Sequence, residues 1–377
     1  MTALLAIGRR LRYGAAALIT LSVGIGGVPQ AAAASSSWLV QPTPALPLAA
    51  LSGVAALGNR DVWSVGFHCS GGGCGTLIEH WNGSRWQVIG SPPTDGGYLE
   101  SVSGVSAGDV WAVGSTTASS RTLAEHWNGS GWSIAATPSP AGSTGILDDI
   151  DAVAPNDAWA VGYDTDAYGT TRGLIEHWNG TSWGVVSGPG SYILKSVAAT
   201  SARDAWAVGY QNDGGELIEH WNGSRWAIVR GAAGYAVLDG VAALSPTDAW
   251  AVGNRRTDRY LDETLVEHWD GTRWTVVRSP SPNGSYCCVD LQSVAALSGT
   301  DAWAVGYFQT TAGAPRQTLI EHWNGTRWSV VTSPDMAGYR NTLASASGMS
   351  GGAGWAVGQF DDGAGYVQPL MLSTSTA

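Results

Sequence analysis

Hydrophobic residues along this chain fall in short segments separated by turn-forming residues, and the pattern recurs. Between positions 291 and 334 the segments read LQSVAAL, DAWAVGY, TLIEHW and RWSVV. Short apolar segments bounded by Gly, Asn, Asp, Ser or Pro are typical of β-strands. Asn324-Gly325 separates the third and fourth segments, and this dipeptide suits a tight hairpin. Each unit therefore predicts four consecutive strands.

Tryptophan positions count the copies of this unit. Trp followed by Ala-Val-Gly or Ser-Val-Gly recurs at spacings of 44 to 53 residues, at Trp63, Trp111, Trp159, Trp206, Trp250, Trp303 and Trp355. A second Trp closes Glu-His-Trp in six units, and a third follows the next turn. With Trp38, these positions account for all 20 tryptophans. A four-stranded repeat of this length is typical of a β-propeller blade, so we predict an all-β, seven-bladed propeller.

The two ends of the chain predict how the ring closes. The last unit contains Trp355 and a third strand near positions 367 to 372, but the chain stops before a fourth strand. The segment 37 to 42, SWLVQP, reads like the fourth strand of a blade, RWTVVR at 273 to 278, although no blade precedes it. We expect this N-terminal strand to complete the seventh blade and so remove the open sheet edges.

The first 34 residues have the layout of a secretory signal. Arg9, Arg10 and Arg12 precede an apolar run from Gly14 to Val28, and small residues follow up to position 34. We predict a signal peptide at 1–34, a single propeller domain at 35–377, and a secreted, extracellular protein. A ring of this kind is one domain despite its length, because each blade lacks a core without its neighbours.

Charge narrows the range of partners. The formal net charge is -11, and removing three signal arginines makes the remaining chain still more acidic. Binding to nucleic acid or to anionic membranes needs basic patches, so neither is expected. No membrane insertion is predicted, and the protein is expected to be a monomer.

Four cysteines in an exported chain first suggest disulfides. Cys69 and Cys74 flank a flexible Ser-Gly-Gly-Gly segment and are predicted to form a bridge. Cys287 and Cys288 are adjacent, and a bridge between neighbours distorts the peptide. A vicinal disulfide, two thiols and pairing with another loop all stay open for this pair.

The runs EHWNGTRWSVV and SVAALSGTDAWAVG resemble the Kelch repeat and the DAWAVG/EHWNG repeat proteins exported by actinobacteria and related soil bacteria. The resemblance covers residues 38 to 372 and implies the propeller fold, but no activity. It departs from Kelch in having one glycine after the second strand, as in Gly306-Tyr307, instead of a doublet. Enzymes resembling galactose oxidase share the propeller but need a copper site with two histidines, for which this sequence offers no set.

Six histidines recur once per unit, each on the predicted third strand. A third strand lies roughly 10 Å outside the strand that lines the channel, so these histidines cannot converge on one ion. A structural role is expected, in which each His, together with its Glu partner, bonds within or between blades. We therefore predict no metal site and no cofactor.

One position of the innermost strand is polar and different in most units. It follows a uniform Leu that lies twelve residues before each repeat Trp, and it reads Ser52, Glu100, Asp148, Lys195, Asp239, Gln292 and Ala344. We expect it to ring the mouth of the central channel, on the face with the long unequal loops. Tyrosines lie nearby at offsets of 13 to 17 residues from the Trp, so a single asymmetric site is predicted.

We predict a binding module that holds a glycan or protein ligand on this face, since variable loops on a rigid scaffold commonly carry binding sites. Tyrosines would supply flat contacts, and the polar ring would supply hydrogen bonds. The predicted ligand-binding residues are Tyr98, Glu100, Asp148, Tyr192, Lys195, Tyr235, Asp239, Tyr286, Asp290 and Gln292.

The alternative is a polysaccharide-degrading enzyme at the channel mouth. A glycoside hydrolase needs two carboxyl groups roughly 5 to 10 Å apart, for which Glu100 with Asp148 or Asp239 are the candidates. A lyase would use a base such as Tyr192, with Lys195 stabilising the developing charge. No residue motif decides between binding and catalysis.

Overall fold

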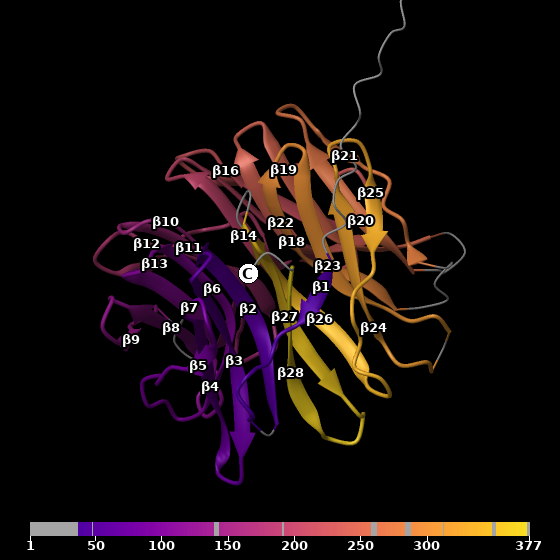
Figure 1. Cartoon of the computed structure of the whole chain (residues 1–377). Helices are drawn as coiled ribbons and strands as arrows, with labels where there is room; N and C mark the ends of the chain where they lie inside the picture. The colour runs from indigo at the N-terminus through magenta and orange to yellow at the C-terminus, as the bar shows by residue number, and fades with distance from the viewer. Residues whose placement is uncertain are drawn as a thin grey trace, which may run out of the picture. The chain divides into compact units, whose positions relative to one another are not determined.

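The computed structural model describes residues 37–46, 48–138, 143–190, 192–257, 262–282, 288–311, 313–348 and 352–374. These residues form seven sheets of four antiparallel strands, which follow one another around a ring (Figure 1). The predicted seven-bladed propeller is confirmed. Within the described ranges, no helix has the length and apolar character needed to cross a membrane. The predicted signal segment, Tyr286 and Cys287 lie outside the described residues.

In six blades the strands run outward from the centre of the ring in sequence order, and in the last blade β1 takes the outer position. The innermost strands are β2 (Ala49–Gly58), β6 (Gly97–Ser106), β10 (Thr144–Ala154), β14 (Tyr192–Ser201), β18 (Ala236–Ser245), β22 (Val289–Ser298) and β26 (Arg340–Gly348). The second strands, which carry the repeat Trp, are β3 (Asp61–Ser70), β7 (Asp109–Thr116), β11 (Asp157–Thr165), β15 (Asp204–Gln211), β19 (Asp248–Arg256), β23 (Asp301–Phe308) and β27 (Gly354–Asp361).

The outer half of each blade holds a third strand, which carries Glu-His-Trp in six blades, and a short edge strand. The third strands are β4 (Gly73–Trp81), β8 (Thr122–Trp127), β12 (Thr171–Trp178), β16 (Glu216–Trp221), β20 (Asp262–Trp269), β24 (Gln317–Trp323) and β28 (Val367–Thr374). The outer strands are β5 (Trp86–Val88), β9 (Trp132–Ala135), β13 (Trp183–Val185), β17 (Trp226–Ile228), β21 (Trp274–Val276), β25 (Trp328–Val331) and β1 (Trp38–Val40).

The ring closes through the N-terminal strand, as the sequence predicted. β1 pairs antiparallel with β28, from Trp38 opposite Thr374 to Val40 opposite Leu372. In Figure 1 the indigo β1 lies among the yellow strands of the last blade. Trp38 is 4% exposed, and its ring meets Trp303 of the preceding blade edge to face at 5.4 Å. β1 therefore contributes both backbone pairing with β28 and a buried core side chain, Trp38, to the last blade.

Tryptophans join each blade to the next. Trp206 of β15 lies 4.9 Å from Trp269 and 5.2 Å from Trp274, both in the following blade, measured between ring centroids. On its other side it packs against His220 of its own blade at 4.2 Å. Aromatic pairs of this kind add about 0.5 to 1.5 kcal/mol each beyond the burial of their surface. The repeated tryptophans are therefore used in holding the ring together.

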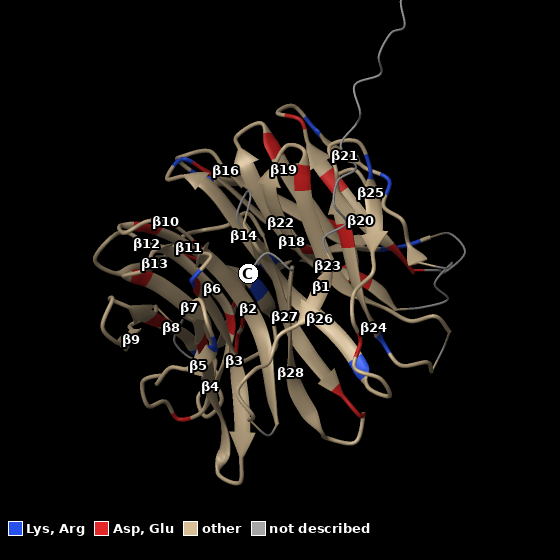
Figure 2. Ribbon diagram, in the orientation of Figure 1, with Lys and Arg blue, Asp and Glu red and all other residues tan. Residues whose placement is uncertain are grey.

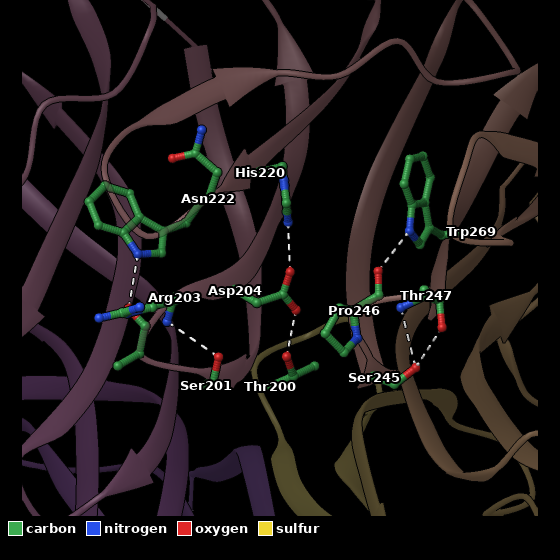
Figure 3. Close-up of polar contacts among 12 residues, drawn as sticks. Thr200, Ser201, Arg203, Asp204, His220, Asn222, Ser245, Pro246, Thr247 and Trp269 are labelled. Carbon is green, nitrogen blue, oxygen red and sulfur yellow. Dashed lines mark hydrogen bonds and ion pairs between the residues drawn. The ribbon is translucent and has the colours of Figure 1, made fainter.

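The repeated histidines bond within their own blades, to an aspartate at the start of the second strand. His220 Nε2 lies 2.8 Å from Asp204 Oδ1 at the start of the second strand, and Thr200 donates to the other oxygen of that carboxylate (Figure 3). The same His–Asp pair recurs in six blades, with distances of 2.7 to 2.9 Å. Adjacent residues of a strand point to opposite faces, so the Glu cannot share the partner of its His.

The glutamates instead lie between blades, and each is at most 2% exposed: Glu79, Glu125, Glu176, Glu219, Glu267 and Glu321. Some accept a hydrogen bond from the connection that follows the preceding blade. Ser91 donates to Glu125 at 2.8 Å, and Ser279 donates to Glu321 at 2.7 Å. Within the described part of the chain, neither carboxyl oxygen of Glu79 or Glu176 has a hydrogen-bond partner. Burial raises the pKa of both groups to about 7.

The Asn-Gly turns are four-residue loops. Trp81 pairs with Trp86, which leaves positions 82 to 85 as the connection. Asn82 Oδ1 accepts hydrogen bonds from the backbone N–H groups of Ser84 and Arg85, and Gly83 takes a left-handed φ of 89°. The Asn-Gly dipeptide thus forms the predicted turn between the third and fourth strands, and the asparagine side chain stabilises it. The connection has four residues, which is longer than a two-residue hairpin loop.

Candidate ligand-binding channel

Each of the seven innermost strands contains a β-bulge at the position that varies between blades. In β10, Leu147 pairs with Gly162 and Asp149 pairs with Val161, so Asp148 between them has no partner in the ladder. The equivalent unpaired residues are Ser52, Glu100, Lys195, Asp239, Gln292 and Ala344. A bulge bends its strand and re-aims the extra side chain. Each blade thus presents one side chain from a residue that takes no part in strand pairing.

The glycine of the Trp-Ala-Val-Gly motif permits this bulge. A methyl group on Gly162 would lie 2.0 Å from the carbonyl oxygen of Ile146, far inside van der Waals contact. The same distance recurs at the equivalent glycine of every blade. Only a residue without a side chain fits at this close approach of two backbones.

Replacing Gly162 by alanine should therefore lower the free energy of unfolding by on the order of 2 to 4 kcal/mol, because backbone must move to admit the methyl group. Gly184→Ala is the matched control in the same blade, since an added methyl there meets no atom within 4 Å. Urea unfolding midpoints of the two variants measure the difference. Equal midpoints would contradict the steric role assigned to the motif.

The seven bulged residues line a central channel of about 390 Å³. Charged or amide side chains come from five consecutive blades, whereas Ser52 and Ala344 on the two remaining blades are small. The predicted variable ring therefore lies at the channel, and its polarity is strongly one-sided. Along the ribbon, acidic residues are spread over strands and turns, and many of the basic residues lie in turns or near strand ends (Figure 2).

Two carboxyl-centred clusters make up the polar side of the channel. Lys195 Nζ donates to Asp148 Oδ1 at 2.9 Å, across neighbouring blades. Asp239 is hydrogen-bonded to Asp290, whose carboxylate also accepts from Gln292 Nε2 at 3.0 Å. Asn254 Nδ2 donates to the remaining oxygen of the same carboxylate, also at 3.0 Å.

Burial dominates the electrostatics of these groups. It raises the pKa of Glu100 and of Asp148, and Lys195 only partly offsets the effect. Burial, together with the adjacent Asp290, raises the pKa of Asp239 well above its usual range. Burial alone would lower the pKa of Lys195, but its carboxylate neighbours raise it overall, so Lys195 is charged. Two carboxyl groups this close cannot both ionise readily, so the Asp239–Asp290 pair retains a proton more readily than an isolated carboxyl group does.

Below the bulges, the channel wall is closed by hydrogen bonds between blades. Asp149 accepts from Ser101 Oγ at 2.6 Å, from Ser196 Oγ at 2.7 Å and from the Val197 N–H at 2.9 Å. Asp151 accepts from a backbone N–H of the same neighbouring strand at 2.8 Å. Asp149 and Asp151 thus bond to neighbouring strands and hold the blades together. The bulged carboxylates, in contrast, have oxygens that a ligand can reach.

The structure does not bring Tyr98, Tyr192 or Tyr235 into the channel. Tyr98 lines a neighbouring hollow and packs against Phe67 at 4.8 Å. Tyr192 packs against the hydrophobic cluster that contains Trp159, so the proposed base for a lyase does not line the channel beside Lys195. Tyr235 is 72% exposed at the rim of another hollow.

Sequence analysis did not identify three residues of the second strands that lie near the bulged positions of the channel. Asn254 contacts the Asp290 carboxylate, and Tyr163 lines the hollow that also contains Glu100. Arg316 lies 4.2 Å above the ring of Tyr307. All three second-strand residues directly follow the motif glycine, a position that varies between blades. The variability of this position is the sequence feature from which these residues could have been predicted.

The cysteine predictions have separate outcomes. Cys69 and Cys74 form the expected disulfide near the hairpin that joins β3 to β4. Cys288 has a left-handed φ of 64°, and its N–H donates to Asp262 Oδ2 at 3.0 Å. Cys287 lies outside the described residues, so the pairing of this adjacent pair stays open. No group of three or more His, Cys, Asp or Glu side chains arranged for a metal ion occurs among the described residues.

Comparisons with known proteins give the fold but no family. No family model and no curated protein sequence matches this chain. Among solved structures it is similar to YCF48 bound to D1 peptide, with 14% identity over 90% of this chain and 97% of that chain, and a TM-score of 0.57. YCF48 from Cyanidioschyzon merolae gives 14% identity over 90% of this chain and 99% of that chain, and a TM-score of 0.55. The chain shares their propeller fold.

A weaker likeness is to the SapL1 lectin in complex with alpha methyl fucoside, at 16% identity over 77% of this chain and 97% of that chain, with a TM-score of 0.48. Likeness at these identities concerns architecture alone. The resemblance to Kelch and to the exported repeat proteins of actinobacteria stays a prediction.

Proposed function

We propose that this chain is an exported binding module that holds a glycan in the central channel. The observation that carries the proposal is the one-sided set of bulged side chains: Glu100, Asp148, Lys195, Asp239 and Gln292. Their acceptors and donors lie close together in a concave site, which suits the closely spaced hydroxyl groups of a sugar. The signal-like N-terminus and the Cys69–Cys74 disulfide support an extracellular setting.

Two buried carboxylate oxygens support the channel as the place of binding. Asp148 Oδ2 and Asp239 Oδ2 have no hydrogen-bond partner within the described part of the chain. A buried acceptor without a partner costs about 1 to 3 kcal/mol, which a donor on a bound ligand would recover. Other acceptors of the channel wall, such as Asp149, are already occupied.

The geometry supports binding over hydrolysis. Glycosidases place their two carboxyl groups about 5 to 10 Å apart, to leave room for the scissile bond. Asp239 and Asp290 are directly hydrogen-bonded and are therefore closer than this. Asp148 Oδ1 already accepts a hydrogen bond from Lys195 at 2.9 Å, so only Oδ2 of this carboxylate is left for a ligand. A protein ligand remains the alternative for the same surface.

A glycan array, with each well recovered for mass spectrometry, tests the proposal. We expect retention of intact glycans, and we expect Ala344→Trp to reduce retention about tenfold or more by filling the channel. This variant leaves every charged side chain in place, and Ala344→Ser is the control that adds little volume. Retention unchanged by Ala344→Trp would place the site outside the channel, and cleaved glycans would make the protein an enzyme.

A further inference from the structure

The charges of the channel do not balance among the residues that line it. Glu100, Asp148, Asp239 and the adjacent Asp290 face one cation, Lys195, and that cation is already bonded to Asp148 at 2.9 Å. Placing several carboxylates in a partly buried site is unfavourable unless positive charge or protons compensate them.

The protein alone compensates by holding a proton on the aspartate pair. Asp239 and Asp290 are hydrogen-bonded to each other, and Asp239 Oδ2 is buried and accepts from no donor group in the described residues. Asp290 is 7% exposed and is fixed by Asn254 and Gln292. An approaching cation can replace this proton, because it supplies the same charge from outside the protein.

We propose that the ligand of this channel carries a primary ammonium group, which binds between the Asp239–Asp290 pair and Asp148, and that the ligand is an amino-sugar glycan. The proposal rests on the proposed glycan-binding function. An ammonium supplies three hydrogen-bond donors and a full positive charge, whereas carboxylate oxygens only accept. Hydrogen bonds between charged partners are also the stronger kind.

The surroundings of the channel favour a sugar chain over a lysine side chain. Glu100 lines both the channel and an adjoining hollow of about 540 Å³, which also contains Tyr98 and Tyr163. Thr116 and Thr165 line the same hollow and add hydroxyl groups. An amino sugar held in the channel can therefore continue into a site with aromatic faces and hydroxyl groups, which fits a pyranose ring.

Two hexasaccharides that differ only in acetylation test this proposal on the whole mature chain. Calorimetry at about pH 6, where amines are protonated, compares the glucosamine hexamer with the N-acetylglucosamine hexamer. We expect the amine form to bind at least about tenfold more tightly. Its affinity should fall with added salt, and binding should release protons into the buffer.

Substitutions in the channel test whether the bound group is positively charged. Asp239→Asn and Glu100→Gln should each weaken binding of the glucosamine hexamer about tenfold. Lys195→Gln should strengthen it, because this change frees the Asp148 carboxylate and removes a competing cation. A neutral or anionic ligand would respond to Lys195→Gln in the opposite direction. Asp95→Asn, which removes an exposed carboxylate outside the channel lining, is the charge-matched control and should change nothing.

The outcomes separate the inference from the function on which it rests. Equal affinity for both hexamers would overturn the ammonium while leaving glycan binding in place. Binding of a lysine-rich peptide, but of neither hexamer, would overturn both the amino sugar and the glycan. If none of the three probes binds, the inference fails, and the glycan array decides the function separately.

Discussion

A chain that lacks Trp38–Gln41 is expected to melt about 10 °C or more below the intact protein. The deletion removes β1 and its ladder with β28, together with the backbone hydrogen bond from Gln41 to Met371. It also removes Trp38, whose loss alone should cost on the order of 3 to 5 kcal/mol because its site lies in the cluster with Leu343 and Leu372. One kcal/mol corresponds to a few degrees in a domain of this size.

Point variants of the same strand provide the control for this deletion. Trp38→Ala should reproduce much of the loss, whereas Leu39→Ala should have little effect because Leu39 is 48% exposed. The open edge of β28 should also promote association between copies, which light scattering would detect. An unchanged melting temperature in the deletion variant would rule out ring closure by β1.

Stability should fall as pH rises, and this is the second large effect. Burial raises the pKa of Glu79 and Glu176 from about 4.5 to about 7, and that of Glu321 to about 8. Each folded carboxyl thus holds its proton more tightly than the unfolded chain does. Its contribution to stability is complete below about pH 4.5 and is lost progressively as pH rises to about 7 or 8.

The size of the effect follows from the shift in pKa. A change of about 2.5 pKa units corresponds to on the order of 3 kcal/mol for a group as buried as Glu79, which is 0% exposed. We expect the melting temperature to be higher near pH 5 than near pH 8.5. Carboxyls whose pKa burial does not raise, such as the exposed Asp270, act in the opposite direction but are screened by solvent.

Glu79→Gln separates this mechanism from other effects of pH. The amide keeps the size of the side chain but cannot ionise, so the variant should melt above the parent protein near pH 8.5. Near pH 5, where the parent carboxyl holds its proton, the two should differ little. A melting temperature of the parent that rises from pH 5 to pH 8.5 would contradict the assignment of buried, protonated glutamates.

The fold could be predicted because its determinants are local and repeated. Strand patterning, the turn residues and the sevenfold Trp spacing all indicate the same four-stranded blade, and the unmatched segment around Trp38 indicates closure. The channel position could be found because a uniform Leu such as Leu147 fixes the register and leaves the next residue as the one that differs.

The side-chain partners could not be predicted, because they depend on distances between strands. His220 and Asp204 are far closer in space than their sequence positions suggest, and their pairing follows from the register of the sheet. The Asp239–Asp290 pair joins neighbouring blades, and its contact with Asn254 depends on how these blades pack. The tyrosines were expected at one site, but chain offsets alone cannot say which hollow a loop residue enters.

The bulge in each innermost strand has a consequence for how such a protein can diversify. Because Asp148 and its equivalents stand outside the ladder, replacing one of them does not disturb the pairing of its strand. The seven positions can therefore vary on a fixed frame, with coupling between neighbours that touch, such as Asp148 and Lys195, and even 4 residue types at each would give roughly 16,000 combinations. A library confined to these positions would change what the protein recognises while leaving the architecture that presents them intact.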